Sequence, residues 1–315
     1  MSASPAEAEA AASAPGDPEA QRRDVRLGMA AALSAYLCWG LIVIFFKWLG
    51  DIPVWEIVGH RISWTVVFVG LFLALRGRLG EVKAALSDWR VLRALIICAT
   101  LIGANWTIYI WAIDTGEVLQ ASFGYFINPL MNVALGFVLL GERLSRWQGI
   151  AVGLATLSVA IQAMLLPGFP WISLALAGSF AIYGYIRKLT PVGASPGLFV
   201  EATVLLPPAL GFIIYLQVTG AGHFGDDPLT VVQLMLTGVL TALPLILFAI
   251  GARRLRLATI GLVQYLAPSI QFLLAVFVYG EPLSSARLAT FVLIWISLAI
   301  YTADSVRHRP QPMAV

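Results

Sequence analysis

The feature that most constrains this chain is a series of ten apolar stretches, each about 17 to 24 residues long and separated by short connections. A transmembrane α-helix needs roughly 20 mostly apolar residues to cross a hydrocarbon layer of about 30 Å, and it satisfies its own backbone hydrogen bonds. The sequence therefore predicts an all-α polytopic membrane protein with ten transmembrane helices. The predicted spans are 27–50, 53–75, 91–113, 118–140, 147–166, 169–186, 196–217, 229–251, 257–279 and 287–303.

The composition agrees with a lipid bilayer as the surroundings of the chain. Of the 315 residues, 59% are hydrophobic and 12% are charged, whereas roughly a quarter of an ordinary soluble chain is charged. The net charge of +3 comes from basic residues that stand singly or in small groups between the apolar runs. That arrangement is typical of residues that set orientation in a membrane, so we expect no nucleic-acid partner.

The basic residues are distributed unevenly between the two sides of the predicted membrane. With ten spans and the N-terminus inside, 17 of the 20 Lys and Arg residues fall in cytoplasmic segments, where membrane proteins enrich them. We therefore expect a multi-pass protein of the inner (cytoplasmic) membrane with both termini in the cytoplasm. Residues 1–25 are expected to form a disordered cytoplasmic tail, and residues 306–315 a cytoplasmic C-terminal tail.

An internal repeat appears when residues 105–161 are laid on residues 244–300 at a constant offset of 139. Pro129 then matches Pro268, the pair Gly141-Glu142 matches Gly280-Glu281, and Ser158 matches Ser297. This predicts two five-helix repeats, residues 26–166 and 167–305. Because each repeat has an odd number of spans, the second is inverted, an arrangement found in secondary transporters whose solute site lies between the repeats.

Four ionisable residues inside spans are candidates for a charge pair or for coupling, because charge within a membrane is costly and usually functional. Glu56 and His60 share one face of the second span, next to Arg61. Arg61 either lines the solute pathway or forms a structural ion pair, for example with Glu56. His60 either shares a functional role with these residues or is a buried histidine that only packs against its neighbours. Glu201, in the seventh span, is either a proton site or the partner of Arg61. Proton coupling is thus one option.

Polar and aromatic residues gather on the third, fourth, eighth and ninth spans, and prolines interrupt three spans. A proline in the middle of a span frees a backbone carbonyl, and two prolines at matched positions point to a central solute site. The alternative is a packing kink with amides that bridge helices. The predicted substrate-binding residues are Asn105, Trp106, Tyr109, Tyr125, Asn128, Asn132, Gln264, Tyr265 and Gln271, and the predicted helix-kink residues are Pro129, Pro244 and Pro268.

Motifs for nucleotide hydrolysis, hydrolase chemistry or metal binding do not occur in the sequence. We therefore expect a non-enzyme without cofactor or bound metal, which moves small organic solutes as a secondary transporter. With Arg61 as the one deep cation, a neutral or zwitterionic solute with amide or aromatic groups is expected, and a phosphorylated one is not. A membrane scaffold or a membrane enzyme without a recognisable motif is the alternative, and the sequence defines no oligomeric state.

Several segments carry a family resemblance, among them Glu56-Ile-Val-Gly-His60-Arg61, the run from Ala121 to Asn132, and Gly280-Glu-Pro-Leu283. In these the chain resembles the RarD proteins, which are EamA-domain members of the drug/metabolite transporter superfamily. The resemblance implies a ten-span fold of two five-helix repeats and an exporter or permease associated with chloramphenicol sensitivity or resistance. The family pattern commonly has an acidic residue where Gln120 stands, so a coupling role moves toward Glu201 and Glu56.

Overall fold

The computed structural model describes residues 18–50, 52–164, 168–280 and 285–307, and every regular element within these residues is a helix. Seven helical segments in this part of the chain are long and apolar enough to cross a membrane, and one of them, Leu257–Val278, is assembled from three consecutive pieces. The remaining three predicted spans also coincide with helices. The helices are α2 (Pro18–Trp48), α3 (Val54–Leu75), α4 (Leu79–Ser87), α5 (Trp89–Asp114), α6 (Val118–Leu140), α7 (Arg146–Ala163), α8 (Trp171–Leu189), α9 (Ala194–Thr219), α10 (Pro228–Arg254), α11 (Leu257–Gln264), α12 (Leu266–Leu273), the π-helix η1 (Leu274–Val278) and α13 (Ser285–Arg307).

The two ends of the chain are more helical than the sequence predicted. Helix α2 begins at Pro18, so the prediction of a disordered tail over 1–25 is wrong for residues 18–25, and residues 1–17 lie outside the described part. Pro18 occupies the first helical position, where its missing N–H costs no intrahelical bond. Helix α13 extends to Arg307, two residues into the predicted C-terminal tail, and residues 308–315 again lie outside the described part.

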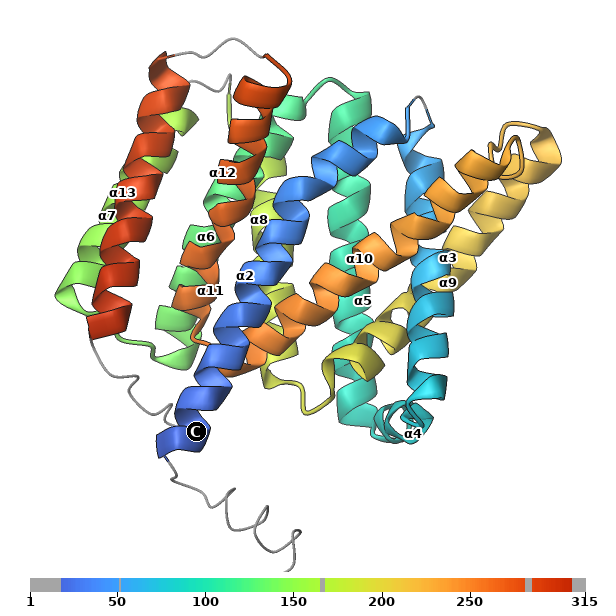
Figure 1. Cartoon of the computed structure of the whole chain (residues 1–315), viewed down its shortest axis with the longest axis horizontal. Helices are drawn as coiled ribbons and strands as arrows, with labels where there is room; N and C mark the ends of the chain where they lie inside the picture. The colour runs from blue at the N-terminus through green and yellow to red at the C-terminus, as the bar shows by residue number, and fades with distance from the viewer. Residues whose placement is uncertain (1–17, 51, 165–167, 281–284, 308–315) are drawn as a thin grey trace, which may run out of the picture.

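Helix α4 was not predicted, because the connection 76–90 between the second and third predicted spans is too short and too rich in charge to be a span. It buries Val82 and Ala85 on one face and leaves Lys83 exposed on the other. The buried face lies against α5 and α9. In Figure 1, α4 lies across the lower end of the bundle, unlike the long helices.

The two matched prolines have different effects on their helices. Helix α6 runs through Pro129 without a break, whereas the ninth span is interrupted at Tyr265 and restarts as α12 two residues before Pro268. A proline lacks the N–H that a helix interior needs but is tolerated in a first turn. The break at Tyr265 therefore places Pro268 where its missing donor is not required.

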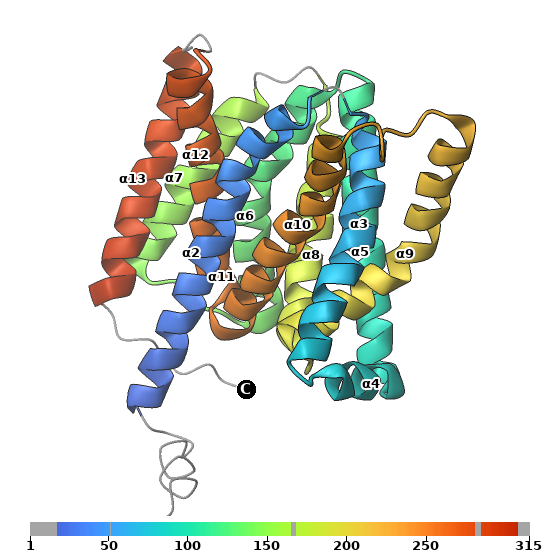
Figure 2. The same cartoon turned by 45° about the vertical axis from the view of Figure 1, so that its right-hand side comes forward.

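Helix contacts in the bundle come in matched pairs. Counted in chain order within each half, the contact of α6 with α8 corresponds to that of α12 with α2. The contact of α5 with α8 corresponds likewise to that of α10 with α2, and the contact of α5 with α9 to that of α10 with α3. Three further contacts join α3 with α9, α6 with α11, and α7 with α13. Figures 1 and 2 show α7 and α13 side by side at one edge of the bundle, away from α3, α9 and α10.

Two buried hydrogen bonds hold α7 against α13. Ser158 Oγ donates to the Thr290 carbonyl at 3.0 Å, and Ser297 Oγ donates to the Ala151 carbonyl at 2.7 Å. The offset of 139 that aligns the two halves of the sequence carries one of these bonds onto the other. The correspondence between the halves therefore extends from sequence to individual contacts.

Candidate functional site

A cavity of about 410 Å³ lies in the middle of the bundle, between α2, α3, α5, α6, α8 and α10 on its sides and α11–α12 beside them. Its lining reaches Gly50 and Ile52 in the connection from α2 to α3. Figure 1 shows that connection at the upper end of the bundle, opposite the connections α6–α7 and α10–α11. The predicted site residues that line the cavity are Arg61, Asn105, Trp106, Tyr109, Tyr125, Asn128, Gln264, Pro268 and Gln271.

Arg61 is the charged residue of the cavity, since every other lining residue in the described part of the chain is uncharged. Its Nε donates a hydrogen bond of 2.9 Å to Thr241 Oγ1, and the Thr241 hydroxyl in turn donates to the Thr237 carbonyl at 2.7 Å. The guanidinium carbon lies 4.8 Å from the centroid of the Trp106 ring and 5.9 Å from that of Phe46. Arg61 is thus held by a neutral hydroxyl and by aromatic faces.

The amide side chains connect the two proline-containing spans. Asn132 Nδ2 donates to Asn128 Oδ1 and to Gln264 Oε1, each at 3.1 Å. Asn128 and Gln264 line the cavity, while Asn132 is fully buried behind them. The structure therefore brings together these three predicted residues, but it places Asn132 in a supporting position and not in the wall.

Two other predicted amides line the cavity while bonding to neighbouring helices. Asn105 Nδ2 donates to the Leu176 carbonyl at 2.8 Å and to Ser179 Oγ at 2.9 Å. Gln271 Nε2 donates to the Trp39 carbonyl at 3.0 Å. Asn105 therefore bonds to α8 and Gln271 to α2. Both amides thus bridge helices, which was the alternative to a role in solute binding.

Tyr265 and two of the prolines lie outside the cavity wall as the structure describes it. Tyr265 is fully buried, and its hydroxyl donates to the Phe126 carbonyl at 3.0 Å. Pro129 is part of the tight contact between α6 and α11, because a Cβ at Gly261 would lie 2.5 Å from the Pro129 carbonyl oxygen. Pro244 is buried within α10. Tyr265 and Pro129 therefore belong to the contact between α6 and α11.

Glu201 pairs with Arg187, so the predicted pair with Arg61 is wrong. Arg187 Nε lies 3.3 Å from Glu201 Oε1, and the Tyr183 hydroxyl donates to Glu201 Oε2 at 3.2 Å. Arg187 stands in the last turn of α8, where the sequence suggests an exposed residue at the edge of the membrane. It is instead fully buried, and its partner comes from the next helix, α9.

Glu56 pairs with His223 and not with Arg61. Its Oε1 accepts the His223 backbone N–H at 2.7 Å, and its Oε2 lies 2.7 Å from His223 Nδ1. His60 lies 3.9 Å from the same carboxylate and stacks on Phe224 at a centroid distance of 4.9 Å. Both partners come from the connection between α9 and α10, residues 220–227. Glu56 and His60 therefore bind this connection to α3 and do not line the cavity.

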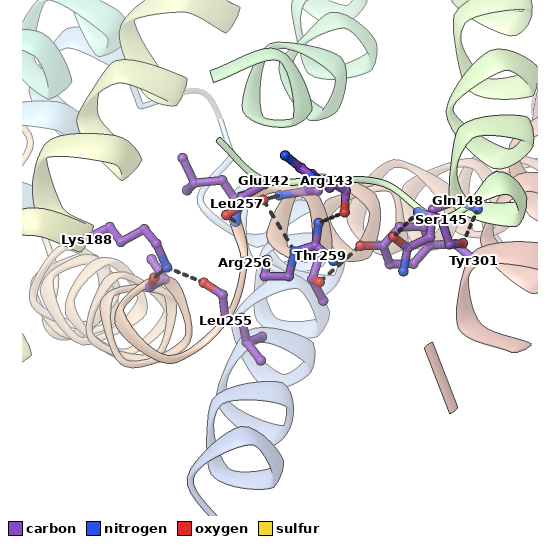
Figure 3. A network of polar contacts seen from close by, with 12 residues as sticks. Glu142, Arg143, Ser145, Gln148, Lys188, Leu255, Arg256, Leu257, Thr259 and Tyr301 are labelled. Atoms are coloured by element: carbon purple, nitrogen blue, oxygen red, sulfur yellow. Dashed lines mark hydrogen bonds and ion pairs between the residues drawn. The ribbon is translucent and has the colours of Figure 1, made fainter. Parts of the chain in front are cut away.

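A polar network lies at the end of the bundle that holds the connections α6–α7 and α10–α11 (Figure 3). Glu142 accepts hydrogen bonds from the backbone N–H groups of Leu257 (2.7 Å) and Ala258 (3.0 Å), at the start of α11. A carboxylate at a helix N-terminus satisfies free donors and complements the helix dipole. In the sequence Glu142 stands out only as a repeat marker, although an acidic residue at matched span ends could have suggested a cap.

Basic side chains complete this network. Lys188 Nζ donates to the carbonyls of Ala252 and Leu255 at the end of α10, and Arg256 donates to the Arg143 carbonyl. Arg256 Nε also lies 3.8 Å from Glu142 Oε2. The network therefore joins α8, α10 and α11 to the connection that follows α6.

Comparisons with known proteins agree with this architecture. Residues 26–164 match the model of the EamA-like transporter family. A protein named RarD from Salmonella typhi is 40% identical over 285 residues, which cover 90% of this chain and 97% of that protein. An uncharacterized transporter from Vibrio cholerae is 41% identical over 290 residues, which cover 91% of this chain and 95% of that protein.

A solved crystal structure shares the fold. It superposes with a TM-score of 0.70 at 20% sequence identity, over 89% of this chain and 98% of that chain. The long apolar helices and these relatives make the protein a multi-pass membrane protein. The chain belongs to the EamA-like transporter family, as a permease of the RarD type within the drug/metabolite transporter superfamily.

Proposed function

We propose that this protein is a secondary transporter, which carries small organic solutes through its central cavity by alternating access. The observation that supports the proposal best is the cavity of about 410 Å³ with its polar centre, enclosed by apolar helices of both halves of the chain. Solute sites of secondary transporters lie at such a position between repeats. The relatives are named as transporters, which favours a non-enzyme over a membrane enzyme without a motif.

The proposed architecture is ten spans in two inverted repeats. Ten spans result when α11, α12 and η1 count as one and the short α4 is set aside. The matched helix contacts and the two reciprocal serine bonds between α7 and α13 support a two-fold relation between the halves. An axis of this kind passes near the contact of α6 with α11, where Tyr265 bonds to Phe126, its own counterpart at the offset of 139.

The proposed orientation places both termini in the cytoplasm, on the basis of the Lys and Arg distribution. The Glu142 network then closes the cytoplasmic end of the bundle, and the cavity extends toward the outside through Gly50 and Ile52. In this proposal the structure represents a state closed to the cytoplasm. Opening that end requires Glu142 to leave the start of α11.

If protons drive the cycle, we assign the coupling to Glu56 in preference to Glu201. The partner of Glu56, His223, has a side chain that is 39% exposed, whereas Arg187 and Glu201 expose only 0% and 2% of theirs. A proton can therefore reach the first pair from solvent without a rearrangement of the bundle. Either residue would act at a distance, because neither lines the cavity.

Loss of solutes from proteoliposomes tests the proposal for a broad range of solutes at once. Vesicles loaded with a mixture of small organic metabolites would be diluted, and the retained compounds measured by mass spectrometry. The parent protein should release at least one compound faster than protein-free vesicles do. The variant Val43→Trp, which fills part of the cavity, should retain it. Equal retention by the folded parent, this variant and empty vesicles would instead favour a non-transporting scaffold.

A further inference from the structure

The charge of the central cavity identifies the class of solute. We infer that the solute is an organic anion with a single carboxylate on a flat apolar body, and that Arg61 binds the carboxylate. The inference rests on the proposed transport function and deepens it. It follows from the hydrogen bonds, the neighbours and the walls that surround the guanidinium.

The guanidinium of Arg61 keeps most of its donors free. It carries five N–H groups in a planar fork, and within the described residues it uses one of them, on Nε, for the bond to Thr241. The groups on Nη1 and Nη2 make no hydrogen bond to the described protein, and the residue is partly exposed to the cavity that it lines. The free side of the fork is the side that binds a carboxylate with two parallel hydrogen bonds.

No carboxylate of the described chain forms an ion pair with Arg61. The two acidic residues that could have done so are engaged elsewhere, Glu56 with His223 and Glu201 with Arg187. An unpaired charge inside a membrane is costly, and the aromatic faces of Trp106 and Phe46 compensate only part of this cost. Water in the cavity can solvate Arg61 in the empty protein, and an anionic solute can replace that water.

The walls indicate the rest of the solute. Aromatic rings form part of the cavity lining, with Trp39 and Phe180 in an edge-to-face contact at 5.8 Å and Tyr109 and Tyr125 in another at 5.9 Å. Flat apolar groups fit such surfaces. A cavity of about 410 Å³ is at the small end of ligand pockets, which suits a molecule of one or two rings.

The same observations exclude other charge classes. A phosphorylated or dicarboxylate solute would bring a second negative charge to a cavity whose described lining contains a single cation. A zwitterion would bring its ammonium group near Arg61 with no described acidic side chain in the wall to bind it. The inferred monoanion thus differs from the neutral or zwitterionic solute expected from the sequence, and a neutral analogue is the comparison that decides between them.

Binding of three matched compounds tests the inference. The probes are 3-phenylpropanoate, its neutral amide 3-phenylpropanamide, and the zwitterion phenylalanine, each titrated calorimetrically into the purified protein. Charged hydrogen bonds to a bidentate carboxylate should make the anion bind about 10- to 100-fold more tightly than the amide. Arg61→Gln should remove this preference, and Arg61→Lys should keep part of it, because lysine retains the charge without the fork.

Lys47→Gln is the matched control. Lys47 is a second cation inside a predicted span and stands in the last turn of α2. Its Nζ lies 3.3 Å from the centroid of the Tyr279 ring, and the residue does not line the cavity. Its removal should leave the preference unchanged, and thermal unfolding would confirm that all variants fold. Equal binding of anion and amide, the same preference in Arg61→Gln, or no binding of any probe to the folded parent would overturn the inference. The transport proposal is tested separately, by the release of solutes of any charge from vesicles.

Discussion

Arg187 Nε and Glu201 Oε1 lie 3.3 Å apart inside the bundle, and their side chains expose 0% and 2% of their surface. The pair connects the last turn of α8 with α9, and Tyr183 adds a hydrogen bond to the carboxylate. Burial of two opposite charges is stable only when each has the other. The pair therefore links the end of α8 to α9 and is a site where single substitutions have large effects.

Single removal of either charge should destabilise the protein more than removal of both. Arg187→Met and Glu201→Gln each leave one uncompensated buried charge and should lower the free energy of unfolding by about 3–5 kcal/mol, whereas the double variant should recover part of that loss. The exposed pair Arg78–Glu81 is the control. The same substitutions there should change the free energy of unfolding by less than about 1 kcal/mol. Unfolding in detergent measures these values. A double variant no more stable than the worse single one would contradict the pairing.

Gly197 should not tolerate even a methyl group. A Cβ at this position of α9 would lie 2.2 Å from Arg187 Nη1 and 2.7 Å from Nη2, and the guanidinium is held in place by Glu201. Gly197→Ala should therefore lower the unfolding temperature. Gly211→Ala on the same helix meets open space and should be neutral or stabilising by up to about 1 kcal/mol, because alanine favours a helix. Equal behaviour of the two variants would show that Arg187 can move aside.

Glu142→Ala should loosen the closed end of the bundle. The substitution removes both acceptors at the start of α11, which should cost about 1 kcal/mol and favour the state open to the cytoplasm. The readout is maleimide labelling in inside-out vesicles of Leu245→Cys, a cavity position, with Cys38 and Cys98 replaced by alanine. Labelling should become several-fold faster. Glu81→Ala, which removes an exposed acid from α4, should leave the labelling rate unchanged. An unchanged labelling rate with Glu142→Ala would contradict the proposal that Glu142 holds the cytoplasmic end closed.

The amides of the cavity should act on the solute. Asn128→Ala and Gln264→Ala each remove a hydrogen-bonding group from the wall, so the affinity for the transported solute should fall about 5- to 10-fold. Each substitution also removes one acceptor of the buried Asn132 amide, so the free energy of unfolding should fall by about 1–2 kcal/mol while the protein still folds. Gln217→Ala, at an exposed position near the end of α9, serves as the control. Transport at the parental rate and affinity by both cavity variants would place the solute elsewhere.

The proposed orientation can be tested with single cysteines in a background without Cys38 and Cys98. An impermeant maleimide added to intact cells should label Asp226→Cys, an exposed position in the connection before α10. It should not label Lys83→Cys, an exposed position on α4, until the membrane is opened. The reverse pattern would invert the orientation and assign the Glu142 network to the outside.

The sequence predicted the positions of the helices well, because the length and apolar character of a span are local properties. All ten predicted spans coincide with helical regions. Helix α4 was missed since nine residues with charges give no span signal. The sequence predicted kinks at both Pro129 and Pro268, but α6 runs through Pro129, and the ninth span breaks at Tyr265, three residues before Pro268.

The candidate site was predicted in composition but not in its pairings. Seven of the nine predicted substrate-binding residues line the cavity, whereas Asn132 and Tyr265 lie behind it. The partners of Glu201 and Glu56 depend on how distant or adjacent helices pack, which no spacing within a single helix reveals. Arg187 in particular looks like a residue of the membrane edge until α9 covers it.

The paired serine bonds between α7 and α13 restrict how the two halves can move. Neither helix contributes a described residue to the cavity wall, and Ser158 and Ser297 bond from each helix to the other. Sliding of one half along the other would break both bonds together, whereas rotation about an axis through this pair can preserve them. In the alternating-access cycle that we propose, the relative motion would be a rotation about this edge, and a small angle here would become a large displacement at α3 and α9 on the far side.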